Sequence, residues 1–198
     1  DLFGLKRDGM VVYQLKKGLK LKTRAGTLDK IILVETSFRE VYNPPGFEIK
    51  ENDTVLDVGA QIGSWTVYAA SKTKTGIVYA FEPEDNNYSL LEENIRLNHL
   101  KNVKTYKEGV SNKTGFQELF LSAVNVGGHS LHIKTGSNKV KKIIKTITLS
   151  KFLSNNRISR IDFLKIDAEG AEYEILQDLS SKLNLIDKSG TNRANMGF

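Results

Sequence analysis

The sequence predicts an α/β fold built on a mostly parallel sheet with helices on both faces. Three observations support this prediction. Apolar runs of strand length alternate with segments of helical periodicity. Two successive runs each end in a carboxylate, Asp57 and Glu82. Gly59 and Gly63 follow the first carboxylate, where a strand-to-helix turn would bring the backbone close to a ligand.

A small N-terminal element is expected before this glycine turn. Residues 10–21 read as an antiparallel pair, with a turn at Lys16-Lys17-Gly18. Apolar residues then recur at helical spacing from about 28 to 42, and Asn43-Pro44-Pro45-Gly46 ends that helix. The chain therefore divides into residues 1–50, a main domain over 51–186, and a tail over 187–198 that has the composition of a disordered end.

The main domain is expected to alternate strands and helices. The expected strands are 55–58, 77–81, 103–106 and 161–167, with an inserted strand pair at 116–121 and 143–147. The expected helices are 64–72, a segment that carries Tyr88, Leu91 and Ile95, a short one at 149–153, and one at 171–182.

Composition narrows the classes of protein and of site. At 198 residues the chain is about one domain, and the lack of cysteine removes disulfides and thiolate metal sites. No secretory leader or apolar span is visible, so we expect a cytoplasmic protein. The net charge of +6 gathers in lysine clusters at 16–24 and 134–145. Because no aromatic residues alternate with these lysines, a solvated surface is favoured over a nucleic-acid site.

The spacing of the glycines indicates which kind of ligand this turn would bind. A dinucleotide site needs G-x-G-x-x-G, and a phosphate-binding P-loop needs Gly-Lys-Ser/Thr; Gly63-Ser64-Trp65 supplies no lysine. The pattern D-x-G-x-x-x-G, followed by a strand that ends in Glu82, is typical of sites for S-adenosylmethionine (SAM). The alternative is a tight strand-to-helix turn, as found in any α/β protein.

Four ordered blocks make the chain similar to the FkbM family of SAM-dependent methyltransferases. They are Arg24-Ala25-Gly26-Thr27-Leu28-Asp29, Asp57-Val58-Gly59-Ala60-Gln61-Ile62-Gly63, Phe81-Glu82-Pro83 and Lys165-Ile166-Asp167-Ala168-Glu169-Gly170-Ala171-Glu172. They extend over roughly residues 20 to 180. The resemblance implies a Rossmann-like class I methyltransferase fold and SAM as the cofactor.

The resemblance also implies which residues bind the cofactor. Glu82 would accept hydrogen bonds from the ribose hydroxyls, and Asp167 would lie beside the transferable methyl group. The remaining implied contacts are Asp57, Gly59, Ala60, Ile62 and Gly63 around the methionine end, Pro83 beside the ribose clamp, and Gly109, Val110 and Ser111 near the adenine. Gln61 stands where the family usually has Asn, which keeps the amide but lengthens its reach.

The implied reaction is the methylation of a hydroxyl on a sugar, glycolipid or secondary metabolite, with a small molecule or carbohydrate as the acceptor. A hydroxyl nucleophile must lose its proton, and the candidate bases are Asp167, Glu169 and His129. Each has a simpler role open to it: Asp167 in binding, Glu169 at a helix N-terminus, and His129 in solvent. We expect no metal, because no third carboxylate stands at suitable spacing.

Two other readings remain open. Asn43-Pro44-Pro45-Gly46-Phe47 is similar to the Asn-Pro-Pro-aromatic motif of nucleic-acid amino-methyltransferases, but Gly46 interrupts it and a linker is favoured. Secondly, a full methyltransferase sheet has three further strands after residue 172, and we expect these strands to be missing. The strand at 161–167 would then be an exposed edge, suited to a homodimer, and the chain would be an inactive or binding-only fragment.

Overall fold

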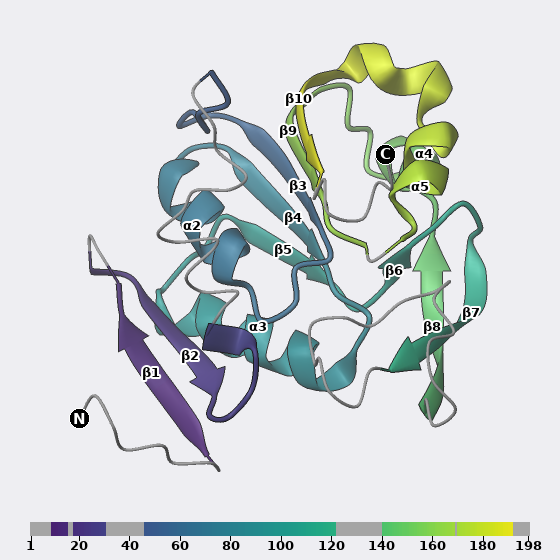
Figure 1. Cartoon of the computed structure of the whole chain (residues 1–198). Coiled ribbons are helices and arrows are strands. Elements are labelled where there is room, and N and C mark those ends of the chain that lie inside the picture. The colour runs from purple at the N-terminus through teal and green to yellow at the C-terminus, as the bar shows by residue number, and fades with distance from the viewer. Residues whose placement is uncertain (1–8, 16–17, 31–45, 122–139, 169, 192–198) are drawn as a thin grey trace.

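The computed structural model describes residues 9–15, 18–30, 46–121, 140–168 and 170–191 (Figure 1). Its centre is a five-stranded parallel sheet in the order β10-β9-β3-β4-β5. The strands of this sheet are β3 (Thr54–Val58), β4 (Ile77–Phe81), β5 (Val103–Tyr106), β9 (Ile161–Ile166) and β10 (Ile186–Thr191). The predicted α/β class with a mostly parallel sheet is confirmed.

Helices cover both faces of the sheet. They are α2 (Ser64–Lys72), α3 (Asp85–Leu97), α4 (Leu149–Asn155) and α5 (Glu172–Asp178), followed by the 3₁₀ helix η2 (Ser180–Leu185). Alternate strand residues face opposite sides, so Leu56 and Val58 pack with α4 and α5, whereas Val55 packs with α2. The helix expected at 171–182 is shorter in the structure, because α5 ends at Asp178.

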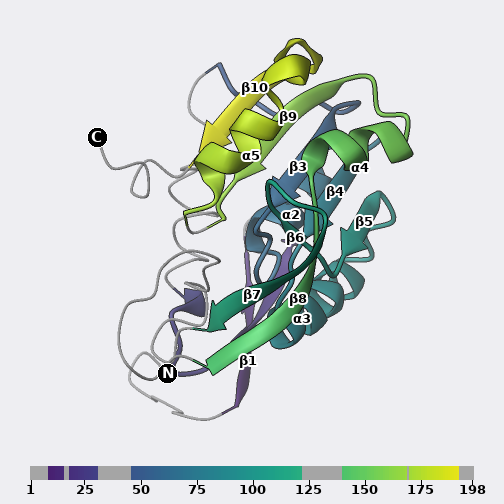
Figure 2. The ribbon, with the colours of Figure 1, turned by 90° about the vertical axis from the view of Figure 1, so that its right-hand side faces the viewer.

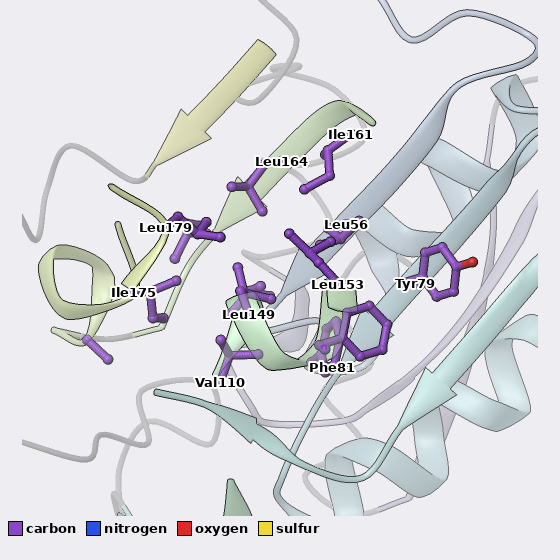
Figure 3. Close-up of a cluster of buried hydrophobic side chains, with 14 residues drawn as sticks. Leu56, Tyr79, Phe81, Val110, Leu149, Leu153, Ile161, Leu164, Ile175 and Leu179 are labelled. Atoms are coloured by element: carbon purple, nitrogen blue, oxygen red, sulfur yellow. The ribbon is translucent and has the colours of Figure 1, made fainter. Parts of the chain in front are cut away.

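The larger core cluster lies between the sheet and helices α4 and α5 (Figure 3). The aromatic rings of Phe81, Tyr106 and Phe152 meet there, with Phe152 edge-on to Phe81 at a centroid separation of 4.8 Å. Such edge-to-face contacts add to the free energy gained by burying the rings. This packing fixes the carboxyl end of β4, where Glu82 follows Phe81.

The hairpin of β1 (Met10–Gln14) and β2 (Lys20–Arg24) docks on α3. Asn94 and Asn98, one helical turn apart, each accept from one backbone N–H of β2 and donate to the carbonyl oxygen of the same residue, at 2.6–3.0 Å. The two amide side chains thus pair with β2 as a neighbouring strand would. Of the expected N-terminal helix, residues 31–45 lie outside the described residues, as do Lys16 and Lys17 of the expected turn.

The inserted strand pair is confirmed and forms part of a separate three-stranded sheet. Strand β8 (Val140–Ile147) pairs antiparallel with β7 (Gly115–Leu121) and parallel with the short β6 (Gly109–Val110). In the side view this second sheet lies beyond the carboxyl end of the central sheet (Figure 2). It is therefore placed to add a wall to a site at that edge.

The expected exposed edge on the strand at 161–167 is wrong. Strand β10 pairs in parallel with β9, from Ile186 opposite Ile161 to Thr191 opposite Ile166. The disordered tail expected from residue 187 is therefore also wrong over 187–191, and residues 192–198 lie outside the described part of the chain. Backbone hydrogen bonds along β9 hold a segment whose sequence lacks strand periodicity, so a homodimer through β9 has no free edge to use.

Candidate functional site

A cleft of about 530 Å³, partly open to solvent, lies at the carboxyl ends of β3, β4 and β9. Its place is where open parallel sheets bind ligands. The lining residues are Val58, Gly59, Gln61, Phe81, Glu82, Pro83, Asn87, Glu108, Gly109, Val110, Leu119, Ile144, Asp167 and Ala168.

The floor of the cleft requires glycine at position 59. Gly59 has φ +77°, and a Cβ on it would lie 1.9 Å from the backbone oxygen of Asp167. The N–H groups of Gly59 and Ala60 both donate to the carbonyl oxygen of Phe81, at 3.1 and 2.9 Å. The turn after β3 therefore bridges β4 and β9, and it brings Glu82 and Asp167 to the same cleft.

Glu82 is held in a network of donors. Its carboxylate accepts from the backbone N–H of Gln61 and from that of Glu84, each at 2.9 Å, and from the side chain of Asn87. Burial, with 4% of the residue exposed, outweighs these hydrogen bonds and raises the pKa of Glu82 to about 7. The hydrogen bonds therefore hold the Glu82 side chain firmly in place, and its pKa lies near neutral pH.

Asp57 does not line the cleft. Its Oδ1 accepts from Lys165 Nζ at 2.9 Å and its Oδ2 from Thr66 Oγ1 at 2.6 Å, and all of its surface is buried. Lys165 Nζ also donates to the carbonyl oxygen of Gly59 at 2.9 Å. Burial opposes the charge on Lys165, but Asp57 and Asp167 outweigh burial and raise the pKa of this ammonium. Asp57 thus stabilises the glycine turn indirectly, through Lys165.

The cofactor residues expected from the resemblance divide into two groups. Gly59, Gln61, Glu82, Pro83, Gly109, Val110 and Asp167 line the cleft, whereas Asp57, Ala60, Ile62, Gly63 and Ser111 are not among its lining residues. Ile62 packs in a core cluster, and a Cβ on Gly63 would lie 2.5 Å from the Leu91 side chain. Ser111 is buried and bonded to Gln117. His129 and Glu169 lie outside the described residues.

Seven lining residues were not predicted as site residues: Val58, Phe81, Asn87, Glu108, Leu119, Ile144 and Ala168. Leu119 and Ile144 come from β7 and β8, so the second sheet forms an apolar wall of the cleft. A Cβ on Gly109 would lie 2.8 Å from Ile144 Cδ1, which shows how closely this wall approaches β6. The apolar residues around Leu119 and Ile144 indicated strands, but they could not show which surface these two side chains would face.

The charge of the cleft fits a ligand without phosphate. Glu82, Glu108 and Asp167 line it, and its described lining includes no lysine or arginine. Carboxylates repel phosphate but suit ribose hydroxyls and a positively charged sulfonium, which are the groups that SAM offers. Among the described residues there is no cluster of metal-ligating side chains and no helix suited to crossing a membrane.

An open parallel sheet with a glycine turn after one strand and a buried carboxylate after the next is the arrangement expected of a class I, SAM-binding methyltransferase domain. Residues 57–192 match the Methyltransferase FkbM domain, and the chain belongs to this family of SAM-dependent methyltransferases. The family resemblance is thereby confirmed; the matched region contains three of the four sequence blocks, and the block at 24–29 lies outside it.

Similarity to individual proteins is more distant. Methyltransferase 1 of Beauveria bassiana is 22% identical over 170 residues, which cover 75% of this chain and 68% of the relative. Hexuronic acid methyltransferase AglP of Haloferax volcanii is 27% identical over 139 residues, covering 70% of this chain and 55% of the relative. The crystal structure of M. jannaschii TYW2 in complex with AdoMet has 31% identity and a TM-score of 0.40, covering 50% of this chain and 42% of that one. The chain thus spans between two fifths and about two thirds of these proteins.

Proposed function

We propose that this domain transfers the methyl group of SAM to a hydroxyl oxygen of a sugar or a related small molecule. The observation that carries the proposal is the cleft in which Glu82 and Asp167 meet across the glycine turn. Similarity to a relative named a hexuronic acid methyltransferase supports a sugar acceptor. SAM would supply a methyl group on a positively charged sulfur, which makes that carbon open to attack.

Glu82 is the proposed clamp for the ribose. An ionised carboxylate accepts hydrogen bonds from two neighbouring hydroxyls, and the backbone N–H groups of Gln61 and Glu84 hold both of its oxygens in place. Gly109 and Val110 of β6, together with Leu119 and Ile144, offer the apolar surface that an adenine ring would contact.

Asp167 is the proposed group that positions the acceptor and takes its proton. It follows β9, where its N–H donates to the carbonyl oxygen of Val58 at 3.0 Å. As the acceptor oxygen bonds to the methyl carbon, the carbon–sulfur bond breaks and the hydroxyl proton passes to a carboxylate. Much of the rate would come from holding the two reactants in line. Glu169 and His129 remain the other candidate bases.

The test is transfer of an isotopically labelled methyl group from SAM to a panel of free and glycosidically linked hexuronic acids and neutral sugars. Product analysis by mass spectrometry and alkaline hydrolysis would separate methyl ethers from methyl esters. We expect an ether, which is stable to base. Asp167→Asn should lower turnover by about 10²- to 10⁴-fold, while the Kd for S-adenosylhomocysteine changes less than about threefold.

Asp187→Asn is the matched control, because Asp187 is half exposed and lies near Arg160, away from the cleft. It should leave turnover unchanged. The proposed role of Asp167 is wrong if both variants turn over alike. Methylation of nitrogen, of a carboxylate or of no sugar in the panel would contradict the proposed acceptor.

A further inference from the structure

Arg24, the last residue of β2, begins a continuous path of polar contacts to the cleft. Its Nε and Nη2 donate to the two oxygens of Asp29, each at 2.9 Å, and its backbone N–H donates to Asp29 as well. Asp29 is 1% exposed, so this bidentate pair is well shielded from water. The pair fixes the plane of the guanidinium group, and Nη2 still has a second N–H that can donate a hydrogen bond.

That second bond reaches Asn87 in the first turn of α3. Arg24 Nη2 donates to Asn87 Oδ1 at 2.8 Å, and Asn87 is 1% exposed and lines the cleft. An amide side chain has an acceptor at one end and a donor at the other. Because Arg24 occupies the oxygen, the nitrogen of Asn87 is the end that donates to Glu82. Arg24 therefore decides which end of the amide the carboxylate meets.

We propose that Arg24 is a positioning residue for cofactor binding, which acts on Glu82 through Asn87. The N-terminal hairpin thereby contributes to cofactor affinity, although its described residues do not line the cleft. This inference rests on the proposed clamp role of Glu82.

The electrostatic consequence has a definite sign. Burial raises the pKa of Glu82 to about 7, and the hydrogen bond from Asn87 lowers it, so loss of that bond would raise it further. The other charged groups around Glu82 are Glu84, whose charge raises its pKa, Lys165 below the turn, and Asp167 and Glu108 across the cleft. None of these depends on Arg24, so a change at position 24 acts through Asn87.

The experiment measures the Kd for S-adenosylhomocysteine by calorimetry between pH 6 and 9. The test variant is Arg24→Lys, which keeps a positive charge for Asp29 but loses the planar fork needed to bond both partners. The matched control is Lys22→Met. Lys22 joins the same strand to the same helix through Glu93 at 2.7 Å, but it has no contact with Asn87. Thermal unfolding of each variant reports whether it folds.

We expect Arg24→Lys to weaken binding about fivefold to tenfold at pH 7 and to shift the pH at which affinity falls toward higher pH. Lys22→Met should change neither. In a Glu82→Gln background, the effect of Arg24→Lys on affinity should disappear, because no carboxylate remains to be oriented.

Four results would contradict the inference, and they lead to three distinguishable conclusions. If Arg24→Lys and Lys22→Met bind alike, or if the loss persists unchanged without Glu82, Arg24 has only a structural role. If the wild type binds but Glu82→Gln binds equally well, the clamp itself is wrong. A folded wild type that does not bind S-adenosylhomocysteine overturns both the proposed function and this inference.

Discussion

Lys165 Nζ lies 2.9 Å from Asp57 Oδ1, and the two residues are register partners on adjacent strands, both shielded from solvent. The same ammonium donates to the carbonyl oxygen of Gly59 at 2.9 Å. One buried cation therefore joins two strands of the sheet to the turn that floors the cleft. A buried charge of this kind is costly to leave without its partner.

Lys165→Met should destabilise the domain by about 3–5 kcal/mol, because the Asp57 carboxylate would stay buried without its cation. Urea unfolding measures this change in the free energy of unfolding. Lys141→Met is the control: its ion pair with Glu118 is about half exposed on each side, and its loss should cost less than about 1 kcal/mol. Equal effects of the two substitutions would show that burial does not increase the contribution of the Asp57–Lys165 pair to the free energy of unfolding.

Gly59→Ala should abolish S-adenosylhomocysteine binding, because the new Cβ would overlap the backbone oxygen of Asp167 and force β3 and β9 apart. Gly18→Ala is the control for backbone strain alone. Gly18 also has a positive φ, of +82°, but an added Cβ there meets no atom within 4 Å. It should cost about 1 kcal/mol of stability and no affinity. Calorimetric binding by Gly59→Ala at wild-type strength would refute the close-approach argument.

The stability of the domain should depend on pH through Glu82. The folded pKa of about 7 lies above the ordinary value of 4.5, so the folded state keeps this proton to higher pH than the unfolded state. The resulting stability is fully present below about pH 4.5 and is lost as pH rises to about 7, a change of about 3 kcal/mol. Unfolding free energies of wild type and Glu82→Gln should diverge over this range; parallel curves would contradict the raised pKa.

Removal of β10 should expose the edge of β9 and cause self-association. A chain that ends at Leu185 loses the whole parallel pairing of Ile186–Thr191, together with the packing of Ile186 against the core. A chain that ends at Thr191 is the control, and it should be as stable and as soluble as the full chain. Light scattering and thermal unfolding distinguish the two, and a shorter chain as stable and as soluble as the control would show that β10 adds little.

The sequence predicted the local parts of the site well. Gly59 and Glu82 each follow a buried strand directly, so their place at the carboxyl edge needs only the strand assignment and the parallel topology. Asp167 was expected there from the family resemblance, and it also follows a buried strand directly. The inserted strands were also predicted, because aromatic and β-branched residues stand on either side of a glycine-rich stretch of sequence.

The parts that were missed depend on contacts far apart in the sequence. Asp57 and Lys165 are 108 residues apart, and only the register of β3 against β9 shows that Asp57 binds a lysine and does not line the cleft. Leu119 and Ile144 became cleft residues through the placement of the second sheet. Strand β10 has a polar sequence, and its parallel pairing with β9 is what defines it as a strand.

The most direct test of the central claim, that Glu82 clamps the ribose of SAM in this cleft, is titration with S-adenosylhomocysteine at pH 8 for the wild type and Glu82→Ala. We expect binding by the wild type and a loss of at least about 100-fold in the variant, since a buried carboxylate that accepts two hydroxyls is removed. Trp65, the single tryptophan, allows a fluorescence check on the same samples. Equal affinity of two folded proteins would contradict the account.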